Sequence, residues 1–196
     1  MNSELRLRLL KMVKEDGSVR AELVATGELF QGYAPHMAEV HTRNARKLAS
    51  MIEQHGWTGK SLVGTDGAEA AWLILQHAIG NPELLRKCLP ILKEAVARGD
   101  VPPAHAAYLE DRICFFELRP QRYGTQFDWD NAGRMSPWEL EDPERVDEYR
   151  RAVGLPSLAE RIEQVRQAEG EEGPKPADLK KRQEEMLKWA KSVGWL

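Results

Sequence analysis

The residues best suited to acid–base chemistry begin with a Gln76–His77 pair at the end of an apolar run. The run, residues 68–79, is apolar nearly all round its last three turns, as in a helix buried in the middle of a domain. Each buried polar group there must find a hydrogen-bond partner or cost about 1–3 kcal/mol. Polar side chains that converge in an interior are the usual material of an active or binding site.

Three further polar residues interrupt apolar helical stripes elsewhere in the chain. His41 and Asn44 share the inward face of a helix predicted over about 35–55, and Asp111 does so in a helix from Pro102 to Leu118. Imidazoles titrate near neutral pH, and a carboxylate can fix their tautomer. We therefore predict His77 and His41 as proton donor or acceptor, with Asp111 orienting one of them.

An irregular, polar segment follows the Asp111 helix and is predicted to hold the ligand. Guanidinium groups bind carboxylates and phosphates in a bidentate manner, so the expected ligand is small, polar and anionic. The predicted binding residues, including the two amides named above, are Asn44, Gln76, Arg119, Gln121, Tyr123 and Gln126.

Other interpretations of these residues stay open. Each histidine could be a satisfied core residue, and the polar cluster could recognise a metabolite or protein without catalysis. A metal site from His41, His77 and Asp111 can be written down, but three ligands from three helices are a weak signal. The sequence therefore predicts no cofactor and metal-independent chemistry, with a divalent metal as the minor alternative.

Two further candidate sites, a phosphate-binding loop and a reactive cysteine, are not supported by the sequence. Gly59-Lys60-Ser61 suggests a phosphate-binding P-loop, but the pattern needs a glycine where the chain has Gln54, and no strand precedes it. Cys88 and Cys114 lie in the middle of predicted helices, and neither is predicted to be an activated thiol. Both are expected to be reduced core residues, which favours a cytoplasmic protein.

The helical patterns predict a mainly α fold. We expect one domain over 1–168, with six or seven helices around a central helix at 67–79 and one β-hairpin near 122–140. Residues 169–176 have linker composition, and 177–196 form an amphipathic helix. That helix either docks on its own chain or makes a homo-oligomer or partner contact.

Composition excludes two classes of partner. The 196 residues carry a net charge of −3 and include no apolar run of membrane-spanning length, so neither nucleic acid nor a membrane is expected.

Several of these motifs together resemble an uncharacterised family of bacterial proteins, common in actinobacteria and labelled a domain of unknown function. The resemblance rests on Gly56-Trp57, Ser61–Gly64, Gln76–Ala78 and Arg119–Gln126, and covers roughly residues 5–165. It implies a bacterial cytoplasmic protein but brings no activity or cofactor. Gly17 departs from the glutamine expected of the family.

Overall fold

The computed structural model describes residues 1–28, 33–130, 132–168 and 177–196. The predicted linker at 169–176 lies outside the described residues. The mainly helical fold is confirmed, with eight helices and one two-stranded antiparallel sheet in the described part of the chain. The contacts of the chain divide it into two compact units, residues 1–102 and 103–196. The single domain expected over 1–168 stays a prediction.

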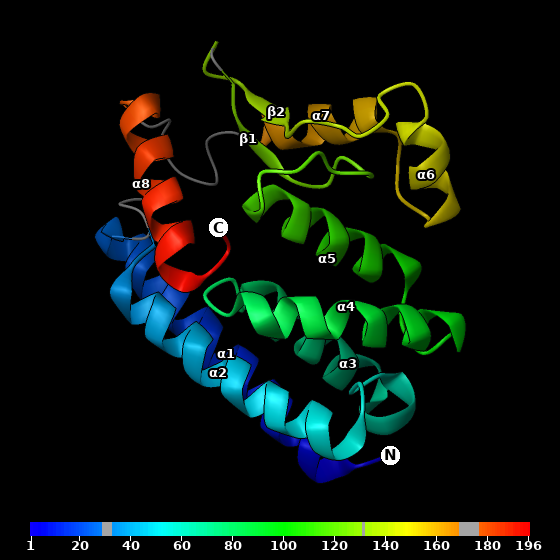
Figure 1. Ribbon diagram of the computed structural model, residues 1–196. Helices are drawn as coiled ribbons and strands as arrows, with labels where there is room; N and C mark the ends of the chain where they lie inside the picture. Colours follow the sequence, from blue (N-terminus) through cyan, green and yellow to red (C-terminus); the bar gives the residue numbers. More distant parts are fainter. Residues whose placement is uncertain (29–32, 131, 169–176) are drawn as a thin grey trace. The chain divides into compact units, whose positions relative to one another are not determined.

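Four helices build the first unit. Helix α1 packs against both α3 and α2, and α2 also packs against α3, so these three share one core (Figure 1). A buried stripe along α1 recurs every three or four residues, which is the spacing of one helix face. The bounds are α1 Ser3–Thr26, α2 Pro35–His55, α3 Lys60–His77 and α4 Pro82–Ala97.

The central helix begins earlier than predicted. We expected it at 67–79 with Asp66 as its cap, but α3 starts at Lys60 and passes through a kink at Gly64. The backbone of Gly64 has φ 76° and ψ 171°, a region that only glycine adopts readily, so the chain can bend there and resume the helix. Asp66 forms an ion pair with Arg6 of α1.

The second unit combines four helices with the predicted hairpin. Strands β1 and β2 are only three residues each, and Phe127 pairs with Pro137. The strands therefore cover less than the hairpin predicted near 122–140. An isolated parallel bridge, outside the hairpin ladder, joins Gln121 to Leu140. The bounds are α5 Pro103–Phe116, β1 Phe127–Trp129, β2 Met135–Pro137, α6 Val146–Ala152, α7 Leu158–Gln167 and α8 Leu179–Val193.

The terminal helix α8 docks within its own unit through aromatic rings. Phe116, at the end of α5, lies 5.6 Å from the ring of Trp189 and stacks on Trp195 at 5.1 Å, measured between ring centroids. Aromatic pairs at such distances add to the free energy of burial. This contact covers part of the apolar face of α8.

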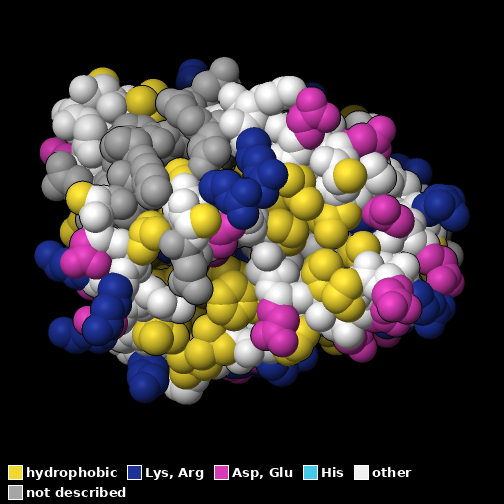
Figure 2. Space-filling view, turned by 90° about the horizontal axis from the view of Figure 1, so that it is seen from above, with side chains coloured by type: hydrophobic (Ala, Val, Ile, Leu, Met, Phe, Trp, Pro, Cys, Tyr) yellow, Lys and Arg dark blue, Asp and Glu magenta, His cyan; other side chains and the backbone are white. Residues whose placement is uncertain are grey.

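Surface chemistry agrees with the predicted absence of a membrane span. None of the described helices is both long and apolar enough to cross a bilayer. On the face presented in Figure 2, side chains of both charge signs are interspersed among hydrophobic ones.

Candidate functional site

The buried carboxylate of Asp16 is the centre of the candidate site. Asp16 belongs to the inward stripe of α1, between Met12 and Val19, and is 3% exposed. Its Oδ2 atom lies 3.0 Å from Nδ1 of His77, the last residue of α3, and 3.2 Å from Nε2 of His41 on α2. Three helices that pack on one another thus bring two imidazoles to a single carboxylate oxygen.

The two histidines predicted from the sequence do meet. Their ring centroids lie 4.8 Å apart and the ring planes are tilted by 37°. Tyr33, which precedes α2, adds a fourth group, because its hydroxyl lies 2.8 Å from Nδ1 of His41. We call Asp16, Tyr33, His41 and His77 the Asp16 cluster.

Electrostatics favour an ionised Asp16. Burial alone would raise the pKa of this carboxyl, but the imidazoles of His77 and His41 outweigh burial and hold the pKa well below its usual range. Burial, together with the charge of Asp16, raises the pKa of Tyr33 above its usual range. At neutral pH the site therefore contains a carboxylate anion beside a protonated phenol.

One nitrogen of His41 is poorly satisfied. Its Nε2 atom is close to Asp16, but the pair is not aligned as a hydrogen bond, and this atom has no aligned partner among the described residues. Buried nitrogens without partners are rare and costly.

A cavity of about 190 Å³ opens onto the Asp16 cluster. All four cluster residues line it, so the imidazoles are reachable by a small molecule. Its remaining lining residues are Arg20, one turn beyond Asp16 on α1, and Ala34 and Met37. Arg20 supplies a positive charge at this cavity.

The predicted binding residues on α2 and α3 lie near the histidines in sequence but have different roles. Asn44 is buried, and its Nδ2 atom lies 3.4 Å from the backbone oxygen of Met12, so it links α2 to α1. Gln76 is half-buried on the last turn of α3. Neither side chain is among the residues that line the cavity.

Asp111 lies in the second unit and organises a loop there. Its carboxylate accepts hydrogen bonds from the backbone N–H groups of Arg122, Tyr123 and Thr125, and from the Thr125 hydroxyl. Burial raises the pKa of Asp111, and these hydrogen bonds offset part of the rise. The carboxylate that contacts both imidazoles is Asp16 and not the predicted Asp111.

The other predicted ligand-binding residues also lie in the second unit. Gln121 is fully buried, and its amide bonds the backbone oxygens of Gln126 and Trp138. The Gln126 side chain donates to Thr125, and Arg119 pairs with Glu117. Each of these side chains thus has a partner within the second unit, which gives it a structural use. Tyr123 contributes its backbone N–H to Asp111, as described above, and its backbone oxygen accepts from Arg150.

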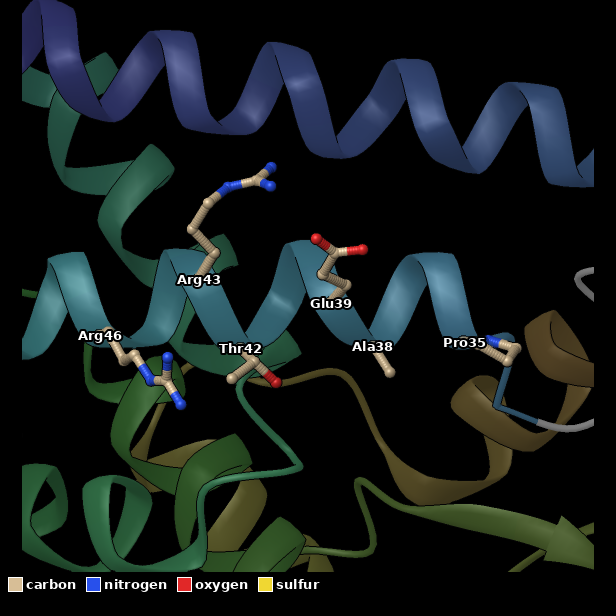
Figure 3. Close-up of a pocket in the computed structure, with 6 residues that line it drawn as sticks. All are labelled: Pro35, Ala38, Glu39, Thr42, Arg43 and Arg46. Atoms are coloured by element: carbon tan, nitrogen blue, oxygen red, sulfur yellow. The ribbon is translucent and has the colours of Figure 1, made fainter.

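The start of α3 and a second hollow along α2 are less suited to binding a substrate than the Asp16 cluster. The start of α3, where Gly59-Lys60-Ser61 suggested a phosphate site, is already occupied: the carboxylate of Asp100 accepts from the backbone N–H and the hydroxyl of Ser61. A second hollow, of about 580 Å³, runs along α2 (Figure 3). Its lining comes from this one helix, and Arg43 within it pairs with Glu15.

Sequence analysis missed Asp16, although the same criterion would have found it. Asp16 stands four residues after Met12 and three before Val19, so it interrupts an inward stripe as His41 does. A glycine follows Asp16 directly, and a glycine inside a helical pattern weakens the prediction of a continuous stripe. In the structure α1 continues through Gly17 to Thr26.

Comparison with known proteins identifies the family of the chain. A family model described as a family of unknown function, DUF6624, matches residues 3–173, and the chain belongs to this family. No curated protein and no solved structure matches the chain.

Proposed function

We propose that this DUF6624 protein is an enzyme that moves a proton on a small, polar, anionic molecule in the cavity of the Asp16 cluster. The single observation that carries the proposal is that two imidazoles share one buried carboxylate at a cavity. A carboxylate hydrogen-bonded to one ring nitrogen fixes the tautomer and leaves the other nitrogen to exchange a proton.

His77 is the best candidate for the proton-exchanging group. Its Nδ1 atom is engaged by Asp16, so in the neutral ring the free lone pair is on Nε2. The His77 side chain is also the more exposed of the two imidazoles, at 28% against 11% for His41. His41, held between Tyr33 and Asp16, is the more fixed partner.

The size and charge of the cavity limit the substrate. A volume of about 190 Å³ is below the roughly 300 Å³ at which drug-sized ligand sites begin, so a molecule of few heavy atoms fits. Arg20 gives an anionic group a partner. We therefore expect the substrate to be a small carboxylate or phosphate compound. We also propose that the protein acts in the bacterial cytoplasm.

A thermal-shift screen tests the proposal. The full-length protein, His77→Gln and the control His55→Gln are each heated with a panel of small carboxylates and phosphates. His55 is an exposed histidine at the end of α2, outside the cluster. We expect one chemical class to stabilise the wild type and the control but not His77→Gln, and we expect the stabilising compound to be turned over when followed by NMR.

Two outcomes would contradict the proposal. Equal stabilisation of all three proteins would place the ligand elsewhere. Stabilisation that depends on His77 but is never followed by turnover, with or without added metal, would indicate a metabolite-binding module instead of an enzyme.

A further inference from the structure

We propose that Asp16, His41 and His77 bind one divalent first-row transition ion, such as Zn²⁺, at the cavity. The inference deepens the proposed function, on which it rests for the use of the cavity, by naming a cofactor. Among the described residues these three form a group in which one ligand atom from each lies within 4.8 Å of the others.

The spacing of the ligand atoms fits a bound ion. Ligands about 2.0–2.1 Å from a tetrahedral Zn²⁺ ion lie roughly 3.3 Å from one another. The two nitrogens lie 3.0 Å and 3.2 Å from the Asp16 oxygen. The third separation, between the two imidazoles, is at most 4.8 Å, so the three ligand atoms already surround one point at the cavity.

The surroundings of His41 are those of a metal ligand. Its Nε2 atom is buried and lacks an aligned hydrogen-bond partner, and a metal ion would satisfy its lone pair. Its Nδ1 atom lies 2.8 Å from the Tyr33 hydroxyl. A ligating histidine nearly always donates its second N–H to an oxygen, which sets the tautomer, and Tyr33 provides that oxygen.

The ligand set selects the class of ion. Two imidazoles and one carboxylate favour Zn²⁺, Co²⁺ or Fe²⁺, whereas Mg²⁺ and Ca²⁺ prefer oxygen ligands alone. Three protein ligands also leave at least one position open for water or substrate, as in catalytic zinc sites. With the ion on Nδ1 of His77, the Nε2 atom would carry the proton of the neutral ring. An ion-bound water would then replace Nε2 of His77 as the proton-exchanging group.

Isothermal titration of chelator-treated, full-length protein tests the site. We expect one Zn²⁺ per chain in the wild type and in His55→Gln, with no comparable response to Mg²⁺. Asp16→Asn and His77→Gln should each weaken Zn²⁺ binding by more than about 100-fold, and Tyr33→Phe by about 10–100-fold. Circular dichroism confirms that each variant is folded.

Cobalt gives an independent readout. Co²⁺ added to the wild type should produce visible absorption bands of nitrogen and oxygen coordination, and these should be lost in His41→Gln. No Zn²⁺ binding by the wild type, or equal binding by the wild type and folded Asp16→Asn and His77→Gln variants, would overturn the inference.

The two proposals fail in different ways. If Zn²⁺ does not bind but a metabolite still stabilises the chelator-treated wild type and not His77→Gln, the metal inference falls and the proposed function stands. If Zn²⁺ binds at the three ligands but no compound is turned over with or without the ion, the enzyme proposal falls and the metal site stands.

Discussion

The Nδ1 atom of His77 and the Oδ2 atom of Asp16 lie 3.0 Å apart, although 61 positions of sequence separate the two residues. The contact joins the end of α3 to the middle of α1. It places a buried anion beside an imidazole, so the site and the packing of the first unit depend on the same interaction.

Asp16→Asn should therefore destabilise the fold in a pH-dependent way. Asparagine removes the negative charge that is hydrogen-bonded to His77 and lies 3.2 Å from His41, and we expect a loss of about 1–3 kcal/mol near neutral pH. The folded-state pKa of Asp16 is lowered below the usual value of about 3.9 for an unfolded chain, so the stabilisation is fully present above that value and disappears as the pH falls through the folded pKa.

Urea denaturation in the presence of a chelator measures this difference. The unfolding free energy of the wild type should exceed that of Asp16→Asn at pH 5, and this gap should narrow as the pH falls below about 4, where the Asp16 carboxylate becomes protonated. A gap that kept growing below about pH 4 would show that the ionised carboxylate is not the stabilising form.

Gly17→Ala should stabilise the protein without affecting the site. Gly17 lies within α1, and a Cβ atom added there would meet nothing within 4 Å. Alanine is favoured over glycine inside a helix by about 0.5–1 kcal/mol. Thermal melting of Gly17→Ala should show this gain, and Zn²⁺ titration should be unchanged.

Gly67 provides the matched contrast to Gly17. It also lies within a helix, α3, but an added Cβ would lie 2.9 Å from Cβ of Val63. Overpacking of this kind usually costs about 1–3 kcal/mol, so Gly67→Ala should lower the melting temperature. Stabilisation by both substitutions would mean that this close contact relaxes at little cost.

Asp111→Asn should damage the second unit while leaving the Asp16 cluster intact. The substitution removes an ionic acceptor from the backbone of residues 122–125, and we expect a loss of about 1–3 kcal/mol. Metal affinity of the folded variant should match that of the wild type. A large loss of Zn²⁺ affinity in this variant would instead support the role predicted from the sequence, in which Asp111 orients one of the two histidines.

The cysteines should be inert in the native protein. Burial raises the pKa of the Cys88 thiol to about 12 and also raises that of Cys114, and both are unpaired. A thiol reagent at pH 8 should label neither until urea unfolds the chain. Rapid labelling under native conditions would contradict the packing of α4 or α5.

Part of this arrangement could be predicted from the sequence, because polar residues in apolar stripes reveal themselves by their spacing. His41 and His77 were found in this way, and Asp16 carries the same signal. The partners of Asp111 and Asp100 could not be predicted. Asp111 accepts hydrogen bonds from backbone N–H groups of a loop, and Asp100 accepts one at the start of α3. The spacing of apolar residues along a helix carries no information about such contacts. The early start of α3 could not be predicted, because a glycine such as Gly64 commonly marks a helix boundary. In the structure its positive φ permits a kink within the helix instead.

Because the site is built from three separate helices, binding of a ligand there should lengthen the lifetime of the folded protein. An unfolded chain cannot hold Asp16, His41 and His77 together, so whatever binds them binds the native state alone. At a concentration 100 times its dissociation constant, such a ligand adds about 2.7 kcal/mol to the free energy of unfolding. Proteases cut the open chain, so scarcity of the ligand would shorten the half-life of the protein and lower its abundance in the cell.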